Sequence, residues 1–271
     1  MTLDAWIETH GLAELWRPLV ATTTAWIASA APAWATEDQR ALACMDLGTC
    51  FFILDDGDDE LARLDLARVT AGERPDPRRP LQLAFAALFD RLAELGPLDH
   101  YLAVRHRFAH ALGVRRAMRA GQRPLDFATY LSLREITIYF EPWLALWEVL
   151  GGYVLTSDQR ALVAPVFDPA NRWQALENDR VSVTRDARTG TPNLVVLIAA
   201  QGLSLAEATT ELRMRADREL AAYTEAMRAL RATPLAPPVV RYLAALEAGV
   251  DGAIRHHRGA DPVRYGAVSD G

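Results

Sequence analysis

Residues 178–186 read NDRVSVTRD, with oxygen-bearing side chains at a regular spacing. Asn178, Ser182 and Asp186 stand four residues apart, so on an α-helix they line one face over two turns. They offer an amide carbonyl, a hydroxyl and a carboxylate, which are oxygen ligands of the kind that Mg²⁺ binds. Arg185 lies beside Asp186 in the sequence and can reach a phosphate group. The stretch therefore predicts a helix that carries one part of a metal site, and a solvent-facing polar stripe is the alternative.

A run of acidic residues stands far upstream, where residues 51–60 read FFILDDGDDE. Asp55, Asp56 and Asp59 occupy positions i, i+1 and i+4, so Asp55 and Asp59 share one helix face. Carboxylates gathered in this way repel one another unless a hard cation neutralises them, and Mg²⁺ commonly bridges carboxylates to a diphosphate. A charge run can also be no more than a solvated face. The presence of two oxygen-rich stretches in one chain favours the metal site.

The rest of the chain predicts helices. It is rich in Ala, Leu, Arg and Glu, which are strong helix formers. Apolar residues recur at spacings of three and four, as in Leu81, Phe85, Leu88 and Leu92. Helix N-caps are expected at Ser157 or Asp158, and at Ser204 with Glu207 three residues later. Breaks are expected at 72–77, 96–97, 123–124, 168–169, 190–192 and 234–238. No long polar linker interrupts the pattern, so we expect one all-α domain over residues 1–271, with about ten helices.

Composition excludes several classes of protein. The 271 residues include 35 acidic and 29 basic ones, every basic residue is Arg, and the net charge is −6. Without a basic excess or a basic stripe, a nucleic-acid partner is not expected. The longest apolar run, residues 194–200, is far shorter than the roughly 20 residues of a membrane span. Met1 is not followed by the basic region of a signal peptide, so we expect a cytoplasmic protein. Cys44 and Cys50 are too few for a disulfide framework or a structural zinc site, and buried thiols are expected.

The two oxygen-rich stretches, in this order, resemble the class I terpene synthases of the bacterial type. Asp55-Asp56-x-x-Asp59 resembles the aspartate-rich motif of that family. Residues 178–186 resemble its second metal motif, with Arg185 and Asp186 where Lys and Glu are more usual. The smaller matches are Tyr130-x-x-x-Arg134 for the diphosphate-sensing arginine, Asn193-Leu194-Val195 after the second motif, and the terminal pair Arg264-Tyr265. The second aspartate-rich motif of chain-elongating prenyltransferases is missing from the sequence.

The resemblance implies an α-helical bundle around a central apolar cavity, with a prenyl diphosphate substrate and inorganic diphosphate as a product. It also implies three Mg²⁺ ions. By this resemblance Asp55 binds two of them, Asp56 and Asp59 orient that cluster, and Asn178, Ser182 and Asp186 bind the third. The residues expected to donate hydrogen bonds to the diphosphate are Arg134, Arg185, Arg264 and Tyr265.

A carbocation formed in the cavity can be stabilised by aromatic faces. Phe51 and Phe52 match family positions that line the pocket, and core packing is the alternative interpretation for both. Weaker candidates are Trp143, Trp147, Tyr139 and Phe140, whereas Trp173 is expected to be structural, and the pair His256-His257 a solvated helix end.

Two positions depart from the family pattern. Arg258 stands where many members have Trp, which would remove a usual aromatic wall. A short shift of the alignment in the loop that contains Pro262 is the alternative explanation. Residues 136–139 read ITIY, without the Gly that usually follows the sensor arginine, so backbone contacts at a helix break there are in doubt.

The resemblance favours farnesyl diphosphate as the substrate, with geranylgeranyl diphosphate close behind, and it allows a homodimer. Two other functions stay open. One is a non-catalytic helical protein that binds Mg²⁺ or prenyl diphosphate. The other is a prenyltransferase that joins two substrates.

Overall fold

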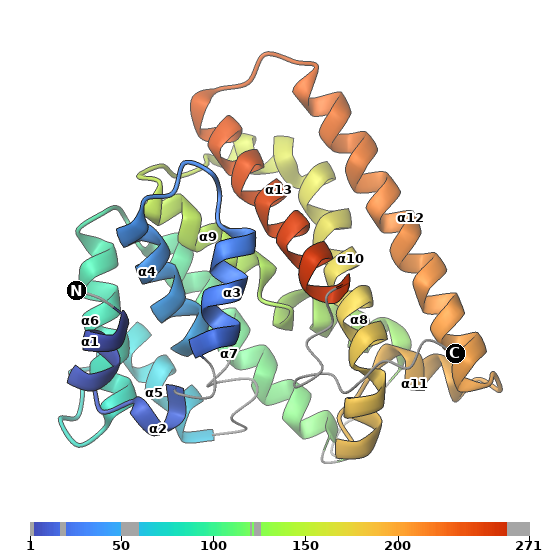
Figure 1. The fold of residues 1–271 in the computed structure, drawn as a ribbon, viewed down its shortest axis with the longest axis horizontal. Coiled ribbons are helices and arrows are strands. Elements are labelled where there is room, and N and C mark those ends of the chain that lie inside the picture. Colours follow the sequence, from blue (N-terminus) through green and yellow to red (C-terminus); the bar gives the residue numbers. More distant parts are fainter. Residues whose placement is uncertain (1–2, 17–19, 50–59, 120, 122–125, 259–271) are drawn as a thin grey trace. The chain divides into compact units, whose positions relative to one another are not determined.

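Helices are the only regular secondary structure in the part of the chain that the computed structural model describes, namely residues 3–16, 20–49, 60–119, 121 and 126–258 (Figure 1). The helices are α1 (Leu3–Thr9), α2 (Ala13–Trp16), α3 (Val20–Ala30), α4 (Glu37–Asp46), α5 (Glu60–Thr70), α6 (Pro80–Ala93), α7 (Asp99–Arg119), α8 (Phe127–Thr137), α9 (Phe140–Leu150), α10 (Ser157–Thr189), α11 (Leu194–Ala199), α12 (Leu205–Arg231) and α13 (Pro237–Arg258). The expected all-α class is confirmed. Within these ranges no helix combines the length and the apolar character that crossing a membrane requires.

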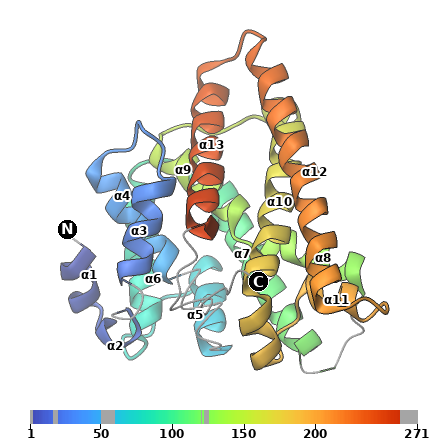
Figure 2. The same cartoon turned by 45° about the vertical axis from the view of Figure 1, so that its right-hand side comes forward.

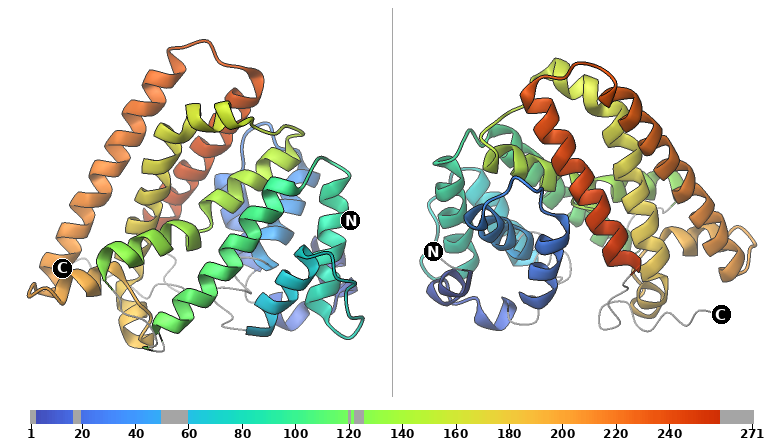
Figure 3. Two further views of the ribbon diagram at one scale, coloured as in Figure 1. Left: turned by 180° about the vertical axis from the view of Figure 1, so that it is seen from behind. Right: turned by 45° about the horizontal axis from the view of Figure 1, so that its top comes forward.

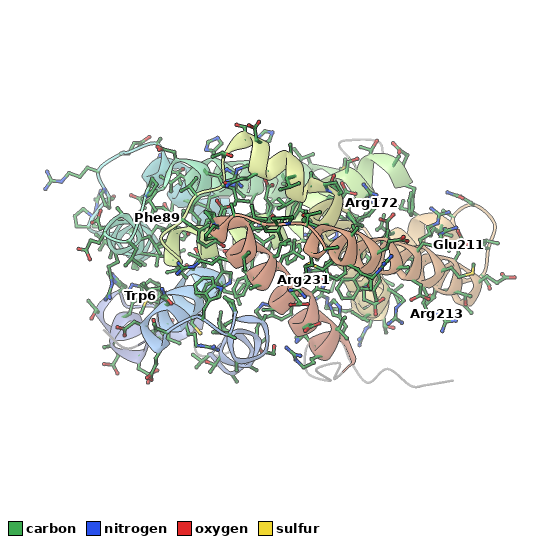
Figure 4. The ribbon with its side chains drawn as sticks, turned by 90° about the horizontal axis from the view of Figure 1, so that it is seen from above. Trp6, Phe89, Arg172, Glu211, Arg213 and Arg231 are labelled. Atoms are coloured by element: carbon green, nitrogen blue, oxygen red, sulfur yellow. The ribbon has the colours of Figure 1, made fainter. Side chains whose placement is uncertain are left out.

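The chain divides into two compact units, one of residues 1–113 and 141–154, the other of residues 114–140 and 155–271. In the first unit α4 packs against α1, α3 and α6, and α5 packs against α6. Its core includes Trp6, Phe85 and Trp147, whose side chains are completely buried. Trp6 and Phe89, which is also buried in this unit, are labelled in Figure 4.

A buried ion pair ties two helices of the first unit together. Asp46, the last residue of α4, accepts hydrogen bonds from Tyr101 and Arg105 of α7. All three side chains are buried. A carboxylate is stable in such a place only when it is paired and hydrogen-bonded, so this contact fixes the end of α4.

The second unit is built on α10, which packs against α8, α11, α12 and α13. Figures 2 and 3 show α10 flanked by α12 and α13, with α8 and α11 toward its C-terminal end. Arg172 of α10, labelled in Figure 4, donates hydrogen bonds to Glu135 of α8 and Glu219 of α12. Trp173 contacts the ring of His257 of α13 edge-on at 6.3 Å. These contacts make α10 a rigid support for the polar side chains near its end.

The ends of α10 are set by local sequence. Thr156 is the N-cap and forms a capping box with Gln159, so the expected N-cap at Ser157 or Asp158 was wrong by one or two residues. Gly190 closes the helix in the left-handed conformation, with φ 65°, which glycine adopts without steric cost.

The expected break at 168–169 was also wrong, because α10 continues through Pro165 and Pro169. A proline inside a helix costs about 3 kcal/mol or more. Here Val166, Ala170 and Trp173 are buried on the same helix. Burial of apolar surface on either side offsets the loss of the proline hydrogen bonds.

Candidate metal centre

The three oxygen-bearing residues of α10 lie together near its C-terminal end. Ser182 and Asp186 are buried and Asn178 is half-buried, so this face of the helix is no solvent-facing stripe. Ser182 Oγ donates a hydrogen bond to Asp186 Oδ2 at 2.6 Å. Arg185 Nε lies 3.0 Å from the other carboxylate oxygen, Oδ1, and donates to it. The carboxylate of Asp186 is thus held on both sides.

Arg134 of α8 reaches this row of residues from across the helix pair. Its Nη2 donates to Asn178 Oδ1 at 2.9 Å, its Nε to Asp179 Oδ1 at 2.8 Å, and its Nη1 to Thr137 Oγ1 at 3.1 Å. The side chain is buried. The predicted sensor arginine and the second motif therefore meet in the structure, 44 residues apart in the chain.

Asp179 joins α8, α10 and α11 at this point. Oδ1 accepts from Arg134, Oδ2 accepts from the backbone N–H of Leu194 at 2.9 Å, and the carboxylate is buried. Burial raises the pKa of Asp179, while the positive charge of Arg134 and the Leu194 N–H act in the opposite direction. Sequence reasoning assigned no role to this residue. The signal that could have indicated a role for Asp179 is that a charged residue stands beside Asn178 on a well-packed helix.

Asn193 also belongs to this cluster and was not predicted as a site residue. It is the N-cap of α11, and its Nδ2 donates to the backbone carbonyl of Asp179 at 2.7 Å and to Asp186 Oδ2 at 2.9 Å. The family match at 193–195 and the break at 190–192 marked a helix start. The contact with Asp186 depends on how α11 returns to α10, which no local pattern encodes.

A helix break follows Arg134 even though the sequence has no glycine there. α8 ends at Thr137, and Tyr139 adopts a φ of 73° before α9 begins at Phe140. The left-handed conformation costs a residue with a Cβ roughly 1–2 kcal/mol. The Tyr139 side chain is buried, and this packing holds the strained backbone in place. The break expected of the family therefore exists, built on tyrosine.

Comparison with protein-family models identifies one family. The model of terpene synthase family 2, described as C-terminal metal binding, matches residues 46–243. The chain belongs to this terpene synthase family. The resemblance inferred from the two motifs is confirmed. No match was found among the curated protein sequences.

Solved terpene synthases share the fold. A linalool/nerolidol synthase from Streptomyces clavuligerus in complex with 2-fluorogeranyl diphosphate is 22% identical, with a TM-score of 0.77, over 96% of this chain and 95% of that one. A 2-methylisoborneol synthase from Streptomyces coelicolor A3(2), in complex with Mg²⁺ and geranyl-S-thiolodiphosphate, is 20% identical, with a TM-score of 0.80, over 99% and 91%. A germacradien-4-ol synthase from Streptomyces citricolor is 23% identical, with a TM-score of 0.74, over 95% and 92%. At these identities the likeness establishes the fold.

The donor set of this terpene synthase fits a hard divalent cation. Asn178, Ser182 and Asp186 can each offer an oxygen atom to a cation, and a single carboxylate with two neutral oxygens suits Mg²⁺ when water or phosphate completes its shell. Within the described ranges no three His, Cys, Asp or Glu side chains form a metal-holding group.

Several predicted site residues of the terpene synthase lie outside the described residues, and so does the side chain of Arg258. These are Phe51, Phe52, Asp55, Asp56, Asp59, Arg264 and Tyr265. Their roles stay predictions.

The remaining aromatic candidates take part in packing. Trp143 contacts the ring of Trp147 at 5.3 Å in the first unit, and Phe140 stacks on Phe167 at 6.1 Å in the second. Trp173 is buried, as the structural interpretation expected. The interpretation of the histidine pair as a solvated helix end was wrong for His257, which is buried against Trp173, because α13 packs this side of its last turns on α10.

Proposed function

We propose that the chain is a class I terpene cyclase, a carbon–oxygen lyase that ionises a linear prenyl diphosphate and cyclises the carbocation. The observation that carries this proposal is the row of Asn178, Ser182 and Asp186 on one face of α10, with the guanidinium of Arg134 on its first oxygen. Membership of a metal-binding terpene synthase family supports it. We further propose that the two units form one catalytic domain, residues 1–271.

The proposed roles divide between ligands and hydrogen-bond donors. Asn178, Ser182 and Asp186 would hold one of three Mg²⁺ ions, while the acidic run with Asp55 would hold the other two. Bound Mg²⁺ acts as a Lewis acid on the diphosphate and so promotes cleavage of the allylic C–O bond. Arg134 carries a fixed positive charge beside the ligand row and can donate to the departing diphosphate.

The next requirement is protection of the carbocation. Water and strong nucleophiles must be excluded until the ring has formed, because either would quench the cation early. Phe51 and Phe52 are proposed to line this pocket with their aromatic faces. The cation finally loses a proton or captures water, with inorganic diphosphate as the co-product. We favour farnesyl diphosphate as the substrate, followed by geranylgeranyl diphosphate.

The test is a set of three incubations with Mg²⁺, using geranyl, farnesyl and geranylgeranyl diphosphate separately, each analysed by gas chromatography–mass spectrometry and for released diphosphate. A cyclic hydrocarbon or alcohol from one of them supports the proposal and gives the chain length. Binding without diphosphate release would favour the non-catalytic protein. Diphosphate release that requires a second prenyl acceptor would favour the prenyltransferase.

A further inference from the structure

Both the oxygen and the nitrogen of the Asn193 carboxamide form hydrogen bonds. The residue is 1% exposed. Its Oδ1 accepts from the backbone N–H of Val195 at 2.9 Å and so caps α11. Its Nδ2 donates to the carbonyl of Asp179 and to Asp186 Oδ2, and also lies 3.4 Å from Ser182 Oγ. One side chain therefore contacts two of the three proposed metal ligands on α10.

These contacts determine the orientation of the Asp186 and Ser182 side chains. Asp186 Oδ2 accepts from both Asn193 and Ser182, while Oδ1 accepts from Arg185. An amide N–H can only donate a hydrogen bond, so the contact with Asn193 keeps the Asp186 carboxylate in the role of acceptor. The hydroxyl proton of Ser182 points to the same carboxylate, and Oγ accepts from Asn193 with one lone pair, which leaves the other lone pair for a cation.

We propose that Asn193 is a positioning residue, which orients Asp186 and Ser182 for the metal ion that they share with Asn178. This inference rests on the proposed function, since it concerns the same site. Hydrogen-bond partners of metal ligands set ligand orientation, and replacing one typically weakens metal binding 10- to 100-fold. Asn193 is fastened at both ends, to α11 through its oxygen and to α10 through its nitrogen, so its donor group has little freedom to turn.

The competing explanation is that Asn193 only caps α11. Two variants distinguish this capping role from the positioning role. Asn193→Ala removes both the cap oxygen and the donor. Asn193→Ser restores a cap oxygen, because serine is a good N-cap, but its short side chain carries no amide donor for Asp186. Ser204→Ala is the matched control, since Ser204 caps α12 through the Glu207 N–H and none of the hydrogen bonds of the metal cluster described above involves it.

The experiment measures binding of Mn²⁺ by electron paramagnetic resonance in the presence of inorganic diphosphate, together with the thermal midpoint of each protein. We expect Asn193→Ser to unfold near the wild-type temperature but to bind Mn²⁺ 10- to 100-fold more weakly, and Ser204→Ala to bind it as the wild type does. If Asn193→Ser binds Mn²⁺ within twofold of the wild type, Asn193 only caps α11 and the inference is overturned.

The same titration distinguishes this outcome from failure of the proposed function. A wild-type protein that binds no Mn²⁺ with diphosphate present would overturn both. A wild-type protein that binds Mn²⁺ and releases diphosphate, alongside an Asn193→Ser variant of equal affinity, would overturn the positioning role alone.

Discussion

Arg134 Nη2 lies 2.9 Å from Asn178 Oδ1, the oxygen that the proposed metal ion would take. A guanidinium and Mg²⁺ are both cations, so they repel each other at one neutral oxygen. Metal binding at Asn178 is therefore expected to loosen this hydrogen bond, which frees an N–H of Nη2 to donate to a diphosphate. The Nε of Arg134 stays paired with Asp179, which keeps the side chain near the site.

Replacing a proposed metal ligand should stop turnover without unfolding the protein. We expect Asn178→Ala and Asp55→Ala each to lower turnover by a factor on the order of 10²–10³, as loss of a group that stabilises transition-state charge does. Glu177→Gln is the matched control, because Glu177 is the neighbour of Asn178 on α10 and pairs with Arg180. Product formation and circular dichroism check the prediction. Unchanged turnover in both ligand variants would contradict the site assignment.

Removing Arg134 should destabilise the second unit by leaving a buried carboxylate unpaired. We expect Arg134→Met to lower the free energy of unfolding by about 3–5 kcal/mol, the usual result of breaking a buried ion pair from one side. Adding Asp179→Asn should recover a large part of that loss, because no charge is then left behind. Urea unfolding measures both. A double variant no more stable than the single one would show that the pair is not the cause.

At position 139 we expect a glycine variant to be more stable than an alanine variant, which is the reverse of their usual order inside a helix. With φ at 73°, alanine meets the steric cost of the left-handed region and glycine does not. We expect Tyr139→Gly to be about 1 kcal/mol more stable than Tyr139→Ala, although both lose the buried ring. Ala221→Gly, at an exposed position inside α12, should instead destabilise by about 1 kcal/mol. Equal stabilities of the two Tyr139 variants would argue against the strained break.

Cys44 should be inert toward alkylating reagents in the folded protein. Burial raises the pKa of its thiol to about 11, so at pH 8 the reactive thiolate is about 0.1% of the population. We expect iodoacetamide to label Cys44 slowly in buffer and readily in urea, with peptide mapping to separate it from Cys50. Its thiol stays neutral in the folded protein up to a higher pH than in the unfolded chain, so its contribution to stability falls as the pH rises above about 9. Equal labelling in buffer and in urea would contradict a buried thiol.

Local patterns predicted those features of the fold that depend on near neighbours. Gly190 ends α10 and Ser204 with Glu207 starts α12, because a left-handed cap and a capping box are formed within a few residues. Pro169 shows the limit of such patterns. Proline breaks an isolated helix, yet Pro169 lies inside α10. Burial against neighbouring helices outweighs the local cost of the proline, and a local sequence pattern shows that cost without showing the burial.

The all-α class, the family resemblance, and the position of Asn178, Ser182 and Asp186 on one helix face could all be predicted from the order of residues, because residues four apart in a helix lie on the same face. The surroundings of that face depend on the tertiary structure. Arg134 reaches it from α8, and Asn193 reaches it from the start of α11. Such contacts join residues on different helices, so they follow from how the second unit packs around α10, and no periodic pattern in the chain records them.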